Sequence, residues 1–439
     1  MKKLFRYVAL FLVLFPLIMI CTSCVKETDN YKRSNLVYYT ADEGSFFVKL
    51  IEKYNKYCQR ELDESYQIEI VRYDSEREMN IIISTEIMAG AGPDIITLDQ
   101  GIPFEKLMET NAFANIDELL EHYEYEIDFS ELNSQIMGCG MYEGRRYIIP
   151  IFYSPNIFFT TQEIIDKYEL NTDTMFFEGL SSINSNTNYD YSLFGSRIEN
   201  TRLMYYFINQ YVDFREKTTD FESDEFLHSL EYIKKLLDGD KTNDAIFYDL
   251  AENNNCLFST ARNMFGGNIK SILSGYSYIS TNNKTPIIVQ NYNKLKNGCL
   301  AYVQCGFAVN DNSQNKEKVL AFIDYVLSED VQGYWCGVDS DSTHFSGTNV
   351  IALPVNNNVL DCAIEEVSDT YDNARYIEDY LEFVKKINGC TIYNYERIEN
   401  TYYNSSVIGD IVDDYLNGVV TTDKFVQRLT AATEIYLTE

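Results

Sequence analysis

Acidic and amide side chains follow two predicted strands at points where a ligand could bind. Asp42 comes after the short apolar segment 36–39, and Asp99 and Gln100 come directly after the apolar run 95–98. In an open α/β sheet, ligands bind in the crevice outside the carboxyl ends of the strands. Carboxylates there can accept hydrogen bonds from hydroxyl groups or pair with a cation. The alternative for each acid is a solvated loop residue.

Aromatic and glycine residues elsewhere could complete such a site. Tyr153 lies in the extended segment 147–155, where its ring could stack on the apolar face of a sugar, although core packing explains it equally well. Gly266 and Gly267 end a predicted strand, and they could let the backbone approach a ligand closely; a plain turn is the alternative. Asp94, in contrast, we expect to cap or to fix a turn rather than to touch a ligand.

Motifs of catalysis and of metal binding do not occur in the chain. The three histidines, His122, His228 and His344, are far apart and lack metal-ligand spacing. There is no G-x-S-x-G elbow, Walker-type loop or H-E-x-x-H sequence. The chain has too many carboxylates to nominate one pair for glycoside hydrolysis. We therefore predict no enzyme activity, no cofactor and no metal site.

Composition argues against several classes of partner. The chain of 439 residues carries 67 Asp and Glu against 36 Lys and Arg, a formal net charge of −31. Nucleic acids and anionic lipid surfaces both need Lys and Arg to meet their phosphates, so neither is an expected partner. The length exceeds what one compact core usually holds and predicts two lobes or domains. We expect a monomer.

The elements that would position the candidate residues alternate along the N-terminal third of the chain. Apolar runs at 36–39, 68–73 and 95–98 predict strands, and helical spacing predicts helices over 46–57 and 76–89. This β-α-β-α-β order specifies a parallel, doubly wound sheet. The segment 147–155 is extended and twice interrupted by proline, which predicts a crossing strand rather than a core strand. Further helices are predicted at 104–110, 116–123, 162–168, 197–214, 223–237, 316–331 and 422–437.

The N-terminus is typical of a secretory signal. Three cations among the first six residues precede an uninterrupted apolar run over 8–20. The following Ile-Cys-Thr-Ser-Cys resembles the lipobox of bacterial lipoproteins, with Cys21 where an aliphatic residue is usual. This resemblance implies a signal peptide over 1–23, a lipid on Cys24, and a polar tether over 24–35. An uncleaved membrane anchor is the alternative.

Several blocks resemble the extracellular solute-binding proteins of ABC importers, in the sugar-type branch that includes maltose-binding protein. The first block is Met-Ala-Gly-Ala-Gly-Pro-Asp-Ile-Ile-Thr-Leu-Asp, residues 88–99. The second is Ala-Phe-Ile-Asp-Tyr-Val-Leu-Ser-Glu-Asp-Val-Gln, residues 321–332. Similar stretches occur at 147–155, 351–356 and 411–437. The blocks follow the order of this family along nearly the whole exported chain.

The resemblance implies an α/β fold of two lobes, periplasmic-binding-protein-like, with a hinge and an inter-lobe ligand cleft. Lobe one would comprise 36–150 and 306–345, and lobe two 151–305 and 346–439. The family often places stacking aromatics after the helix that returns to lobe one, which makes Trp335, the single tryptophan of the chain, a candidate ligand contact. An ordinary half-buried tryptophan is the alternative.

The resemblance also implies a ligand and partners. We expect a small solute, most simply an oligosaccharide, delivered to ABC permease subunits at the extracellular face of the bacterial cell membrane. Two other functions stay open: a lipid-anchored polysaccharide-processing enzyme, and a sensor subunit that presents its ligand to another membrane protein. Some proteins of this superfamily bind ferric iron through adjacent tyrosines, but 36 tyrosines explain the pair Tyr205-Tyr206 by chance.

Cysteine usage permits disulfide bonds without specifying them. An even number in an exported protein is compatible with pairing, yet dispersed cysteines also serve as small buried hydrophobic residues. The eight that follow Cys24 are Cys58, Cys139, Cys256, Cys299, Cys305, Cys336, Cys362 and Cys390.

Overall fold

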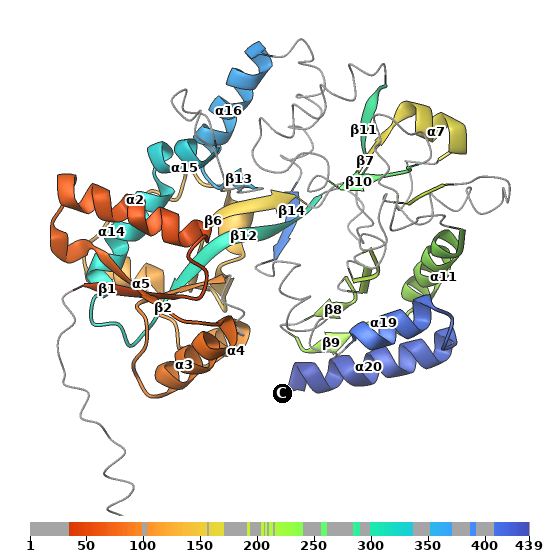
Figure 1. The fold of residues 1–439 in the computed structure, drawn as a ribbon, viewed down its shortest axis with the longest axis horizontal. Coiled ribbons are helices and arrows are strands. Elements are labelled where there is room, and N and C mark those ends of the chain that lie inside the picture. Colours follow the sequence, from red (N-terminus) through yellow and green to blue (C-terminus); the bar gives the residue numbers. More distant parts are fainter. Residues whose placement is uncertain are drawn as a thin grey trace, which may run out of the picture.

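The computed structural model describes two lobes lying side by side (Figure 1). The described residues are 35–98, 102, 104–155, 158–170, 191–193, 203–205, 207–208, 210–213, 216–239, 256–260, 284–289, 299–336, 352–370, 387–391 and 408–438. The predicted signal peptide, Cys24 and the tether up to residue 34 lie outside these residues. No helix in the described ranges is both long and apolar enough to cross a membrane.

The first lobe begins with the predicted parallel β-α-β-α-β unit. Strand β1 (Leu36–Thr40) pairs in parallel with β2 (Ile68–Arg72) on one side and with β3 (Ile95–Thr97) on the other. Helices α2 (Phe46–Glu61) and α3 (Glu76–Met88) connect these strands. Every residue of β1 is buried, as expected for a strand covered on both faces.

Both connecting helices begin directly after a serine cap, at the predicted starts 46 and 76. The Ser45 hydroxyl accepts a hydrogen bond from the backbone N–H of Val48 at 3.3 Å, and Ser75 does the same for Glu78 at 3.3 Å. A cap of this kind satisfies one of the backbone donors that the first helical turn leaves unpaired. The apolar face of α2 is then buried against the sheet through Phe47, Val48, Leu50, Ile51, Tyr54 and Cys58.

Antiparallel strands from distant parts of the chain complete the sheet. The long strand β12 (Cys299–Val309) lies between β3 and β6 (Ile148–Pro155) and is antiparallel to both. Short strands β13 (Leu353–Pro354) and β14 (Ile387–Thr391) pair with β6 and β12 respectively. The resulting seven-stranded sheet has the order β13-β6-β12-β3-β1-β2, with β14 beside β12. Parts of the range predicted for lobe two therefore pair within this sheet.

The prediction that 147–155 is not a core strand is wrong. Strand β6 is buried at all its residues and lies inside the sheet. Pro150 pairs with Gly306 of β12, next to a β-bulge where the register between the two strands shifts. Proline has no backbone N–H, and it is tolerated at a bulge because the regular hydrogen-bond ladder is interrupted there. A Cβ atom at Gly306 would lie 2.9 Å from the carbonyl oxygen of Ile149, so the close approach of these two strands requires glycine.

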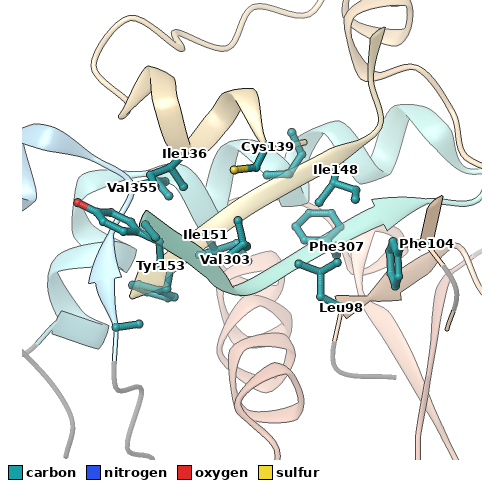
Figure 2. Packing of buried hydrophobic residues seen from close by; sticks show 14 of the residues in the cluster. Leu98, Phe104, Ile136, Cys139, Ile148, Ile151, Tyr153, Val303, Phe307 and Val355 are labelled. Atoms are coloured by element: carbon teal, nitrogen blue, oxygen red, sulfur yellow. The ribbon is translucent and has the colours of Figure 1, made fainter. Parts of the chain in front are cut away.

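The core of the first lobe forms on both sides of β6 and β12. Figure 2 shows Ile148, Ile151 and Val303 of these strands among side chains of the region of α6 (Ser134–Gly138) and of the segment that follows β3. Each of these three side chains is fully buried. Burial of this kind is the main favourable term in folding. The other residues labelled in the figure are Leu98, Phe104, Ile136, Cys139, Tyr153, Phe307 and Val355.

Asp94 has the structural role that its position in the Gly-Pro-Asp turn predicts. Its carboxylate accepts hydrogen bonds from the backbone N–H of Val37 at 2.7 Å and from the hydroxyl of Ser313. The neighbouring Asn310 donates from its side chain to the carbonyl oxygens of Ala91 and Pro93, at 2.8 and 3.0 Å. These contacts join β1, the turn before β3 and the segment after β12 at one buried point.

The helix predicted over 316–331 is two helices. Helix α14 (Lys316–Leu327) ends at Ser328, whose backbone is extended, and α15 (Glu329–Cys336) follows at once. The fully buried Gln332 lies in the second helix. Its amide donates to the carbonyl oxygens of Ile151 and Val326 at 3.4 and 3.3 Å. The change of direction thus lets a polar side chain bind the central strand β6.

The remaining elements of the first lobe are short. They are the 3₁₀ helix η1 (Glu64–Tyr66), α4 (Phe104–Glu109), α5 (Ile116–His122), α6 (Ser134–Gly138), β4 (Met141–Tyr142), β5 (Arg145–Arg146) and α16 (Asn357–Thr370). Cys139, directly after α6, is disulfide-bonded. Cys58, Cys256, Cys305 and Cys362 are not disulfide-bonded, so the described cysteines include both of the states left open by the sequence.

The second lobe combines a small sheet with helices. The sheet is antiparallel, in the order β10-β7-β11. The elements are β7 (Phe158–Thr161), α7 (Gln162–Tyr168), β8 (Val212–Asp213), β9 (Thr218–Thr219), α11 (Asp224–Gly239), β10 (Ser259–Thr260), β11 (Pro286–Val289), α19 (Gly409–Leu416) and α20 (Thr422–Thr438). The last two helices pack through stacked rings of Tyr415 and Phe425, whose centroids are 4.2 Å apart. Strands β8 and β9 form a short hairpin. Helix α20 also packs against β9 of this hairpin.

Candidate ligand-binding site

The carboxyl edge of the first-lobe sheet faces the connection to the second lobe. Strand β6 runs in the same direction as β1 and β3, because β12 is antiparallel to both β3 and β6. After Pro155 the chain continues to β7 of the second lobe. Figure 1 shows β6, β12 and β14 extending towards that lobe. The strand ends where α/β proteins bind ligands therefore lie where the two lobes meet.

Asp42 lies at this edge on an ordered and exposed loop. Its backbone N–H donates to the Thr40 hydroxyl at 3.1 Å, and that hydroxyl donates back to the Asp42 carbonyl oxygen at 3.0 Å. One carboxylate oxygen, Oδ1, accepts a hydrogen bond from the backbone N–H of Gly44 at 2.8 Å. Within the described ranges no hydrogen bond to Oδ2 occurs. The loop thus holds a carboxylate with an acceptor oxygen directed at solvent.

Phe46 is a candidate site residue that the sequence reasoning missed. The helical spacing assigned it to the core face of α2, but it is the first residue of that helix and is only half-buried. Its ring contacts Trp335 edge-on with centroids 4.8 Å apart, and Phe152 in the same way at 5.5 Å. Phe46 therefore stands between the buried aromatic core and the Asp42 loop. The one available signal was its position four residues after Asp42.

Trp335 lies behind Phe46 rather than at the surface. Its side chain is 5% exposed, and its ring also contacts that of Tyr334 edge-on at 5.2 Å. The indole N–H is buried and finds no hydrogen-bond acceptor in the described parts of the chain. In this arrangement Trp335 supports the ring of Phe46. Direct contact of Trp335 with a ligand stays a prediction.

The other predicted site residues fall into two groups. Tyr153 is fully buried in β6, opposite Val303 of β12 and Leu353 of β13, and Figure 2 shows its ring among core side chains. Its role as a ligand contact stays a prediction. Asp99, Gln100, Gly266 and Gly267 lie outside the described residues, although Leu98, which ends the described part of that strand segment, is buried at the same edge.

A bulge in β12 adds a polar side chain near the strand ends. The register against β6 shifts between Val303 and Cys305, which leaves Gln304 as the extra residue. Bulges redirect side chains and are common beside functional sites. Gln304 is half-buried, and its amide can both donate and accept hydrogen bonds. Nothing in the local sequence signals this shift, because it follows from the pairing with β6.

The acidic groups with altered pKa lie away from this edge. Burial raises the pKa of Asp324 on α14, and the Tyr125 hydroxyl donates a hydrogen bond to it at 3.5 Å. Burial and the nearby Asp324 together raise the pKa of Tyr125 to about 12. Among the described residues no group of three or more His, Cys, Asp or Glu side chains could hold a metal ion. The edge offers hydrogen bonding and aromatic contact.

These features define a class of protein: two lobes, joined through extended strands, with polar and aromatic groups of one lobe facing the other. This is the architecture of a solute-binding protein that holds a small molecule between lobes. The sequence matches the model of the family described as bacterial extracellular solute-binding protein over residues 39–333. The chain belongs to this family. It is a family of binding proteins and not of enzymes. No curated protein sequence matches the chain.

Solved structures share the fold at low sequence identity. An ABC transporter solute-binding protein from Thermotoga lettingae, bound with α-D-tagatose, is 16% identical with a TM-score of 0.53. The ABC substrate-binding protein of Listeria monocytogenes in complex with cycloalternan is 14% identical with a TM-score of 0.55. UgpB from Mycobacterium tuberculosis in complex with glycerophosphocholine is 12% identical with a TM-score of 0.56. Each similarity covers 92% of this chain and 98% of the other chain.

Proposed function

We propose that the chain is the solute-binding subunit of an ABC importer and that it captures a carbohydrate between its lobes. One observation carries the proposal beyond family membership: the exposed carboxylate of Asp42 and, four residues later, the half-buried ring of Phe46 both follow β1 at the sheet edge where the lobes meet. A carboxylate accepts hydrogen bonds from sugar hydroxyls, and an aromatic ring packs on the apolar face of a sugar. The bound tagatose and cycloalternan of two similar structures support this ligand class.

In this proposal the ligand closes the cleft. Lobe one comprises the seven-stranded sheet with its helices, lobe two comprises the described elements from β7 to β11 together with α19 and α20, and the segments between them act as the hinge. A solute that contacts both lobes only when they are close together shifts the population towards closure. Asp99 and Gln100 would add polar contacts from lobe one. Gly266 and Gly267 would let the backbone of lobe two approach the ligand.

The proposal also covers location and partners. Cleavage before Cys24 and lipidation of its thiol would anchor a monomer at the extracellular face of the cell membrane. The closed, loaded form would then dock on the permease subunits and release its solute to them. No catalytic step is involved, so the solute leaves unchanged.

A thermal-shift screen of the exported protein, without signal peptide and lipid, tests the function. The panel contains mono- and oligosaccharides, glycerophosphodiesters, peptides, polyamines and Fe³⁺. A ligand that binds only the folded state stabilises it and so raises the melting temperature. At a free ligand concentration of 100 times Kd the stabilisation is about 2.7 kcal/mol. We expect a response to an oligosaccharide without its breakdown. A response to glycerophosphodiesters or Fe³⁺ alone would overturn the carbohydrate assignment, and turnover of a glycan would overturn the binding-protein assignment.

Matched variants then test the site with the sugar found in the screen. Asp42→Ala and Phe46→Ala should each weaken binding about 5- to 150-fold in calorimetry, since each removes a contact of about 1–3 kcal/mol. Asp63→Ala is the control. Like Asp42 it is exposed, and its Oδ1 accepts a hydrogen bond from the backbone N–H two residues later, at 2.8 Å. It follows the far end of α2, about 24 Å away. Equal effects of the two aspartate substitutions would remove Asp42 from the site.

A further inference from the structure

One ion pair joins the two lobes at a distance from the strands that connect them. The Nζ atom of Lys217 lies 3.3 Å from the Oε2 atom of Glu109 and donates a hydrogen bond to it. Among the ion pairs of the described residues, this is the only one with a partner in each lobe. Figure 1 shows α4, which ends at Glu109, and the β8–β9 hairpin on the lower side of the molecule, whereas β6, β12 and β13 lie above them.

Each partner is fixed to its own lobe. Glu109 ends α4, which is anchored in the first lobe by the buried side chains of Phe104 and Met108, 5% and 1% exposed. Lys217 lies in the turn between β8 and β9, and β9 packs against α20 of the second lobe. The turn is closed by the backbone N–H of Glu216, which donates to the side chain of Asp213 at 2.9 Å. A change in the angle between the lobes must therefore change the distance between the two charges.

The turn that holds Lys217 is one in which lysine is an unusual choice. Lys217 has a φ of +56°, in the left-handed region that glycine and asparagine adopt most readily. A lysine there presents its cation from a short and tightly paired hairpin. The hairpin thus directs a positive charge at the acidic end of α4, across the space between the lobes.

The overall charge gives this pair its importance. With a formal net charge of −31, the protein opposes the approach of its own lobes through like-charge repulsion. Among the described residues, the Lys217–Glu109 pair counteracts this repulsion on the side away from the connecting strands. Because both side chains are partly exposed, 44% for Lys217 and 29% for Glu109, water and salt screen the attraction and limit its strength.

We propose that Lys217 and Glu109 form a latch that favours the lobe arrangement in which they are paired. The inference rests on the proposed closure of two lobes about a solute, and it adds a protein-encoded bias to that equilibrium. An exposed pair of this kind changes a population ratio by about two- to fivefold. The latch therefore tunes the ligand-free equilibrium, and the solute would supply the larger shift.

The test measures inter-lobe distances in the exported protein without any ligand. Spin labels on unnatural amino acids at positions 81 and 435, which are exposed on α3 and α20, leave the native thiols untouched. Pulsed electron resonance then gives the ratio of near to far lobe arrangements. Glu109→Gln and Lys217→Gln should each lower this ratio about two- to fivefold, and the double variant should lower it no further. Exchanging the charges, with Glu109→Lys and Lys217→Glu together, should restore it.

The control and the contrary outcomes are specific to the pair. Lys235→Gln removes the same charge from an exposed pair that lies within α11, Lys235–Glu231 at 2.6 Å, and should leave the ratio unchanged. If the latch variants behave like this control, or if the exchanged charges fail to restore the ratio, the latch is refuted. In about 1 M salt, where the Debye length is about 3 Å, wild type and Glu109→Gln should become alike. Since no ligand is present, a silent ligand screen would refute the proposed function without affecting this result.

Discussion

Replacing Asp94 by alanine removes the buried carboxylate that fixes the start of β3. Two donors lose their acceptor: the backbone N–H of Val37, on a residue 1% exposed, and the hydroxyl of Ser313. A buried donor left without a partner costs about 1–3 kcal/mol. Water can reach the Ser313 hydroxyl more easily than the Val37 N–H, so we assign the loss at Ser313 to the lower end of this energy range. The expected decrease in the free energy of unfolding is about 2–4 kcal/mol.

The assay is urea unfolding followed by tryptophan fluorescence. Trp335 is the single tryptophan and is buried in the first lobe, so its emission reports the unfolding of the lobe that contains Asp94. Asp94→Asn keeps the shape and one acceptor oxygen, and it should lose less stability than Asp94→Ala. Neither variant should change ligand affinity once folded, because Asp94 is 6% exposed and its carboxylate is bound within the first lobe.

Asp42→Ala is the matched comparison. Its carboxylate is exposed and binds only the N–H of Gly44 within the described residues, so the loss of stability should stay within about 0.5 kcal/mol. The two substitutions should thus have opposite effects. Asp94→Ala should lower stability without changing ligand affinity, and Asp42→Ala should lower ligand affinity without changing stability. Stability of Asp94→Ala within about 0.5 kcal/mol of wild type would refute the reasoning that its hydrogen bonds hold the turn.

Three further outcomes follow from the structure. Gly306→Ala should destabilise the first lobe by about 1–3 kcal/mol in the same assay, because its Cβ would lie 2.9 Å from a carbonyl oxygen of β6. Burial raises the pKa of Asp324 in the folded protein, so wild type loses stability as the pH rises from the ordinary pKa of a carboxyl group through the raised pKa. Over this pH range the melting temperature of Asp324→Asn should therefore rise relative to that of wild type. A difference in melting temperature that does not change with pH would contradict this. Non-reducing peptide mapping should show the peptide of Cys139 joined to a second cysteine peptide, and reduction should separate the two.

Local signals in the sequence predicted the elements of the first lobe well. Ser45 and Ser75 mark helix starts because a cap acts on backbone groups only three residues away. The apolar runs of β1 and β3 mark buried parallel strands for a similar reason, since burial on both faces removes any polar alternation. Asp94 was also assigned correctly, because the Gly-Pro-Asp sequence restricts its own backbone.

Features that depend on partners far along the chain were missed or misjudged. Helix α6 has five residues, too few for a periodic pattern to appear. Pro150 argued against a core strand, and only its pairing with Gly306 at a bulge makes the central place of β6 possible. The break between α14 and α15 is explained by Gln332 binding the carbonyl oxygen of Ile151, which sequence spacing does not contain.

The sequence by itself determined the class of fold, the family, and the position of Asp42 after the first strand. It could do so because strand order, caps and turn residues act over a few neighbouring positions. Only the tertiary structure decided which side chains gather at the carboxyl edge. It placed Phe46 in front of Trp335, buried Tyr153 in the core, and brought Lys217 to Glu109. Each of these contacts joins residues that are distant in the chain, and their distances are set by the packing of whole elements.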